Sequence, residues 1–109
     1  MARVAVRLSL VVDDQRTTRF FYKDVTLPRE PIKGDFIQHD DNDHVEVDHV
    51  DLLTSPDLSF FKVKGSNVLI EAWLETKSLH FYNYGPNPGT WENACASLKE
   101  DGFTERKDP

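Results

Sequence analysis

Histidines and carboxylates are concentrated in the segment His39–Asp51, whose sequence is HDDNDHVEVDHVD. This segment holds three of the four histidines and six of the nineteen carboxylates. The other thirteen acids are balanced by thirteen lysines and arginines, so the formal charge of −6 comes from this segment. Imidazole and carboxylate groups bind divalent metals, and concentrated negative charge attracts cationic partners. The segment is therefore the first candidate for a functional surface.

The spacing within this segment predicts a β-hairpin that brings two imidazoles together. A loop of two or four residues places His39 opposite His44, with Cβ atoms about 5 Å apart. Glu46 then lies on the same face as His44, because side chains alternate along a strand. Two imidazoles and a carboxylate suit Zn²⁺ or a similar cation. One hypothesis is therefore a surface site for a divalent metal, with His39, His44 and Glu46 as ligands.

A second interpretation makes the same stripe a surface for a protein partner. Its charge favours a basic partner, since complementary charge raises the association rate and sets the orientation. The simpler alternative is a solvated outer face, because outward acids also prevent edge-to-edge pairing of sheets. The candidate partner-binding residues in the stripe are His39, Asp40, Asp43, His44, Glu46, Asp48 and His49.

Aromatic residues near the C-terminus form a second candidate surface. Tyr82 and Tyr84 precede a Gly- and Pro-rich run, 85–89, which predicts an irregular loop, and Trp91 follows it. Exposed Tyr and Trp side chains are typical anchors of binding surfaces. The alternative is that these aromatics pack a helix against the sheet and keep only their polar tips in water.

The sequence gives little support for catalysis. It contains neither a glycine-rich phosphate loop nor a nucleophile elbow. Cys95 falls on the apolar stripe of a predicted helix, which is typical of a small buried residue rather than a nucleophile. We therefore expect a non-catalytic protein that needs no cofactor, unless the hypothetical divalent metal binds.

Composition is that of an ordinary globular protein, predicted to form one domain over residues 1–109. The single cysteine cannot form an internal disulfide, which predicts a reducing, cytoplasmic compartment. The acidic balance argues against general nucleic-acid binding, and no apolar run approaches the ~20 residues that span a bilayer. These features favour a protein partner for a monomer or a homodimer.

Alternation of apolar and polar residues predicts about six antiparallel strands. In the second strand we expect Phe20 and Tyr22 to point inward. In the fourth, the inward set shifts from Val47 to Val50 and Leu52, which predicts a β-bulge at Asp48-His49. The predicted strands are Val4–Val12, Thr17–Leu27, Phe36–His39, His44–Leu53, Phe60–Lys64 and Val68–Glu75, the last two forming a hairpin.

The C-terminal part changes to helical spacing. Apolar residues from Trp91 to Leu98 predict a helix from Trp91 to about Asp101, with Thr90 as N-cap. Gly102 and Phe103 suit a Schellman ending in which Phe103 packs on Leu98. Residues 104–109 are predicted to be a frayed tail.

Together these elements predict an α+β fold, mostly antiparallel β with one C-terminal helix, arranged as a bent sheet or a small barrel. A proline-rich segment, Gly34-Asp35, a short strand, a turn and a bulged strand follow one another in an order that resembles an SH3-like small barrel. A third functional hypothesis, a structural homodimer subunit, places the hydrophobic side chains of Phe21, Ile37 and Trp73 outward on the dimer face.

Overall fold

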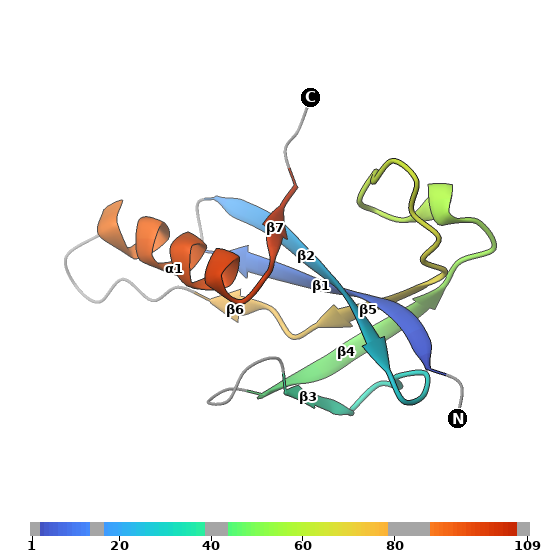
Figure 1. Cartoon of the computed structure of the whole chain (residues 1–109). Helices are drawn as coiled ribbons and strands as arrows, with labels where there is room; N and C mark the ends of the chain where they lie inside the picture. The colour runs from blue at the N-terminus through green and yellow to red at the C-terminus, as the bar shows by residue number, and fades with distance from the viewer. Residues whose placement is uncertain (1–2, 14–16, 39–43, 79–87, 107–109) are drawn as a thin grey trace.

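A computed structural model of the chain describes residues 3–13, 17–38, 44–78 and 88–106 (Figure 1). The strands form one sheet in the order β3-β4-β5-β1-β2-β7, with β6 also beside β1. The elements are β1 (Val4–Asp13), β2 (Thr18–Leu27), β3 (Phe36–Gln38), β4 (His44–Leu52), the 3₁₀ helix η1 (Pro56–Leu58), β5 (Ile70–Leu74), β6 (Lys77–Ser78), α1 (Pro88–Glu100) and β7 (Thr104–Glu105).

The predicted α+β class, with a mostly antiparallel sheet and one C-terminal helix, is confirmed. In the described part of the chain the sheet is open, with β3 and β7 at its two edges, so it is a sheet and not a closed barrel. Two pairings are parallel, because β5 and β6 both run beside β1 in the same direction. No helix in the described ranges is long and apolar enough to cross a membrane.

The register of the first hairpin corrects the prediction that Phe20 and Tyr22 point inward. Phe21 lies opposite Leu10 and is fully buried, whereas Phe20 and Tyr22 lie on the other face and are half-buried. An inward position for Phe20 and Tyr22 requires an odd number of residues in the loop between β1 and β2, because side chains alternate along each strand. The observed pairing of Asp13 with Thr18 leaves four residues between the strands, so the side chains of β2 face the opposite way.

One face of the sheet packs against α1 and forms the hydrophobic core. The alternation along the first strand predicts one inward face with Val4, Val6, Leu8, Leu10 and Val12. All of these except Val4 are buried core members, Val4 packs against the core half-buried, and Cys95 and Leu98 join from the helix. The helix ends as predicted: the N–H of Phe103 donates to the carbonyl of Leu98 (2.9 Å), and Gly102, at φ +94°, donates to Lys99 (3.1 Å). Phe103 is only 3% exposed, so this ending also closes the core.

The helix begins at Pro88, three residues before the predicted start, so Thr90 lies inside the first turn rather than at the N-cap. Proline is favoured at the first helical position, where its missing N–H would have no helical partner. The predicted frayed tail is also corrected at its start. Thr104 and Glu105 pair with β2 as β7, and Glu105 accepts two 2.7 Å hydrogen bonds from Arg19. Residues 107–109 lie outside the described ranges.

The other face of the sheet is covered by residues 53–69, which we call the covering segment. In Figure 1 it lies well away from α1. The predicted hairpin of 60–64 with 68–75 is wrong, because Phe60–Lys64 is not a strand and β5 pairs with β4 and β1 instead. The rings of Phe60 and Phe61 pack on Trp73 of β5 at centroid distances of 5.4 and 6.1 Å. Those side chains therefore serve to cover the sheet.

The strand β4, between β3 and β5, contains the predicted bulge. Val47 pairs with Leu74 and His49 pairs with Trp73, so Asp48 is the extra residue. Val50 packs against the core as predicted, but Leu52 is 68% exposed because α1 does not extend over that end of the sheet.

The three side chains predicted to point outward on a homodimer face do not form an exposed surface. Phe21 and Ile37 are buried at 0% and 9% exposure, and Trp73 is half-buried under the covering segment. The large hydrophobic side chains that are exposed in the described residues are Ile32, Phe36, Leu52, Leu58 and Leu69.

Candidate functional site

The strands β3 and β4 carry the described part of the acidic stripe, and their register differs from the prediction. Gln38 lies opposite His44, where His39 was expected. Five residues separate Gln38 from His44, so the loop has an odd length, whereas the predicted pairing of imidazoles needs an even one. His39, Asp40 and Asp43 lie outside the described residues.

Four side chains form what we call the β3–β4 outer face: Phe36, Gln38, His44 and Glu46. They alternate with Ile37 and Val45, which turn toward the core. All four are exposed, and Phe36 is 65% exposed although it lies directly across from Glu46. The ring of Phe36 meets the imidazole of His44 edge to face at a centroid distance of 5.4 Å. The strand pair thus presents an aromatic side chain among polar groups.

At the bulge, Asp48 and His49 continue the exposed stripe. The Nδ1 of His49 lies 2.8 Å from a carboxylate oxygen of Asp48, and its ring stacks on Trp73 at 5.9 Å. The indole N–H of Trp73 donates to Asp51 at 3.1 Å. These contacts fix the position of His49 while leaving Asp48 and His49 exposed to solvent.

The metal hypothesis gains one feature from this geometry. His44 and Glu46 do share a face, as two ligands of one ion would require. Across the described ranges, no group of three or more His, Cys, Asp or Glu side chains is placed to bind a metal ion. The third ligand that was predicted, His39, lies outside these ranges, so a site at His39, His44 and Glu46 stays a prediction.

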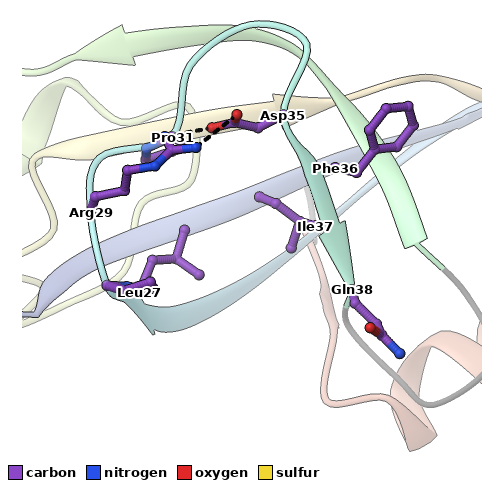
Figure 2. A pocket seen from close by; sticks show the side chains of 8 residues that line it. Leu27, Arg29, Pro31, Asp35, Phe36, Ile37 and Gln38 are labelled. Atoms are coloured by element: carbon purple, nitrogen blue, oxygen red, sulfur yellow. Dashed lines mark hydrogen bonds and ion pairs between the residues drawn. The ribbon is translucent and has the colours of Figure 1, made fainter.

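A pocket of about 230 Å³ opens along the outer edge of β3 (Figure 2). Leu27, Pro31 and Ile37 provide its apolar surface, and an ion pair between Arg29 and Asp35 borders it. Sequence reasoning missed both Phe36 and this pocket. Phe36 and Ile37 are adjacent and apolar, so alternation alone does not tell which of them points outward. The ion pair joins positions six residues apart in an irregular loop, where no periodicity applies.

The Arg29–Asp35 pair fixes the loop that forms the pocket. Arg29 donates to the two carboxylate oxygens of Asp35 at 2.8 and 2.9 Å, and the N–H of Ile32 donates at 2.9 Å. These hydrogen bonds hold the pKa of Asp35 below its usual value, and those from Arg29 have the largest effect. The charged form of Asp35 is therefore favoured in the folded protein.

Because folding lowers the pKa of Asp35, the pair stabilises the fold fully above the unfolded value, about 4, and this contribution is lost as the pH falls through the lowered pKa. We predict that Asp35→Asn unfolds at a lower temperature than the wild type at neutral pH. The difference should shrink when both are melted at pH values falling to about 2. A difference that stays constant with pH would show that the charge of Asp35 is not involved.

The second candidate surface is described only at Trp91. This side chain is half-buried, packs against the core and lies 5.1 Å from the guanidinium of Arg19. It therefore joins α1 to the sheet, which is the packing role considered as the alternative. Tyr82 and Tyr84 lie outside the described residues.

Comparison with known proteins adds no relative to this geometry, because no protein-family model, curated protein or solved structure matches the chain.

Proposed function

We propose that this chain is a non-catalytic, cytoplasmic protein-binding module whose partner carries positive charge. The observation that carries the proposal is Phe36, a large aromatic side chain 65% exposed on a face otherwise made of polar and acidic groups. Aromatic side chains are enriched at protein interfaces and dominate their binding energy, while charged groups form the surrounding rim. The β3–β4 outer face has both features.

The sign of the charge supports a basic partner. Glu46 lies directly across from Phe36, and Asp48 is exposed two residues further along β4. Both belong to the segment that contributes the entire formal charge of −6. Such a field raises the association rate of a cationic partner and orients it before contact. A reducing compartment agrees with Cys95, which is buried and makes no disulfide.

The proposal predicts which side chains matter for binding. Peptides selected from a random library for binding to the wild type should be rich in Lys and Arg. Phe36→Ala should weaken their binding about tenfold or more, as expected for an anchor. Glu46→Gln should chiefly slow association, and this effect should fade as salt is raised. Fluorescence anisotropy and stopped-flow measurements give these quantities.

Two matched variants serve as controls for this experiment. Leu58→Ala removes a hydrophobic side chain of similar exposure, 62%, on η1, and Glu92→Gln removes an exposed charge on α1. Neither should change the affinity. If Leu58→Ala weakens binding as much as Phe36→Ala does, or if Phe36→Ala has no effect, the β3–β4 outer face is not the binding surface.

A further inference from the structure

Among the described residues, the outer edge of β3 offers main-chain groups that pair with no other strand. The carbonyl of Asp35 accepts from the N–H of Val47 at 2.8 Å, so this carbonyl and the main-chain groups of Ile37 turn toward β4. Those of Phe36 and Gln38 then point away from β4, because alternate residues of a strand bond to opposite sides. In the described part of the chain no strand pairs with that side of β3.

This edge lacks some of the usual protection against a further strand, although β3 is short. Natural edge strands are commonly blunted by charged residues or proline within the strand, whereas β3 reads Phe-Ile-Gln. The pocket of about 230 Å³ runs along the same edge, and all three residues of β3 line it (Figure 2). Main-chain donors and acceptors therefore lie beside a recess with an apolar surface. Strand-adding peptides use both features, the first for affinity and the second for specificity.

We propose that the partner binds by adding an extended segment to the sheet as a new strand beside β3, with an apolar side chain in the pocket. This inference rests on the proposed function and names its binding mode. Side chains of an added strand alternate between two faces. Those on the side of Ile37 meet the pocket, while those on the side of Phe36 share a face with Glu46, which lies beyond β3 on β4. The segment recognised is thus one in which apolar and basic residues alternate.

Charge complementarity selects this occupant over a second copy of the chain. A copy would bring its own net charge of −6 to the same edge, and like net charges repel one another. A basic segment meets Glu46 with opposite charge instead. The edge is short, with three residues, so a few main-chain hydrogen bonds supplement the contacts of Phe36 and the pocket.

The test uses a synthetic peptide of alternating valine and lysine and two variants of one residue. Gln38→Pro removes the outward N–H without touching the bonds between β3 and β4, whereas Gln38→Ala removes only the side chain. The alternating peptide should bind Gln38→Ala as it binds the wild type. It should bind Gln38→Pro about tenfold more weakly, from loss of a hydrogen bond that the new strand needs. Equal affinities for the two variants would overturn strand addition.

A second measurement leaves the protein unchanged. N-methyl groups on one alternate set of peptide residues should abolish binding, and the same groups on the other set should have no effect, because only one set faces β3. A peptide of the same composition with valines and lysines in separate blocks should bind weakly. Equal binding of both methylated peptides would also overturn the proposal.

The outcomes separate this inference from the proposed function. If library-selected peptides depend on Phe36 but Gln38→Pro and methylation have no effect, strand addition is wrong and the binding surface stands. If no peptide depends on Phe36, both fail. If the wild type dimerises in light scattering, Gln38→Pro is monomeric and the alternating peptide does not bind, the occupant is a second copy and the basic segment is wrong.

Discussion

Replacing Arg7 by methionine is expected to lower the free energy of unfolding by about 3–5 kcal/mol, because it leaves a buried charge without its partner. Arg7 is fully buried on the face under the covering segment, in the middle of β1. Glu71, directly across from it on β5, is 2% exposed. Methionine fills similar space but supplies neither charge nor hydrogen bonds, so the buried carboxylate of Glu71 is left without a positive charge across from it.

The guanidinium of Arg7 joins the sheet to the covering segment. It donates to both carboxylate oxygens of Asp24 at 2.7 and 3.0 Å, and to the hydroxyls of Ser59 and Ser66 at 2.9 Å each. Ser59 in turn donates to Glu71. The hydrogen bonds with Asp24 chiefly raise the pKa of Arg7 above its ordinary value, so its charge is retained at every working pH.

Urea denaturation of the wild type and Arg7→Met measures this effect. The matched control is Arg19→Met, which breaks a partly exposed pair with Glu105 and should cost only about 0–1 kcal/mol in ion pairing. If Arg7→Met costs no more than Arg19→Met, the buried network does not stabilise the covering segment. The double variant Arg7→Met/Glu71→Gln should recover part of the loss, because both charges are then absent.

Phe21→Ala is the second large effect, with an expected loss of about 3–5 kcal/mol of unfolding free energy. Phe21 is fully buried and lies opposite Leu10 in the core. Phe20→Ala is its neighbour control. That ring packs on Phe60 at 4.9 Å but stays half-buried, so its loss should cost about 1 kcal/mol for the aromatic pair plus a modest area term.

The two phenylalanine variants together test the register of the first hairpin. Urea denaturation of both gives the comparison, with the slope of each curve used to check that unfolding stays two-state. The larger loss must come from Phe21→Ala. A larger loss from Phe20→Ala would mean that β2 faces the other way and that the loop between β1 and β2 differs by one residue.

Elements with a clear period could be predicted from the sequence. The alternation along β1 identified Val6, Leu8 and Val12 as buried, and the shift of period in β4 located the bulge at Asp48. The helix ending at Gly102 and Phe103 was predictable to the hydrogen bond, because only glycine readily adopts the positive φ that this ending requires.

Registers that depend on a single loop residue could not be predicted. Phe20 and Phe21 are both apolar, as are Phe36 and Ile37, so alternation does not choose between them. In each case the length of the adjacent loop decides which side chain faces the core, and one residue more or less in the loop exchanges the two faces. For this reason His44 pairs with Gln38 and not with His39 as expected. The outward position of Phe36 was not predicted for the same reason.

The covering segment was misread because its role depends on distant partners. Phe60 and Phe61 have the composition of a strand, but they pack on Trp73 while Ser59 and Ser66 bind Arg7, more than fifty residues away in sequence. Arg7 alternates with apolar residues in β1 and resembles a solvent-facing residue. Its burial follows from the segment that covers it, which local periodicity does not report.

The central claim is that the β3–β4 outer face and the edge of β3 bind a basic segment, and an NMR titration tests it most directly. ¹⁵N-labelled protein is titrated with the alternating valine-lysine peptide, and amide shifts are followed residue by residue. The largest shifts should fall at Asp35–Gln38 and His44–His49, with the amides of α1 and of the covering segment little changed. Shifts confined to α1 or the covering segment, with none at β3, would contradict the claim.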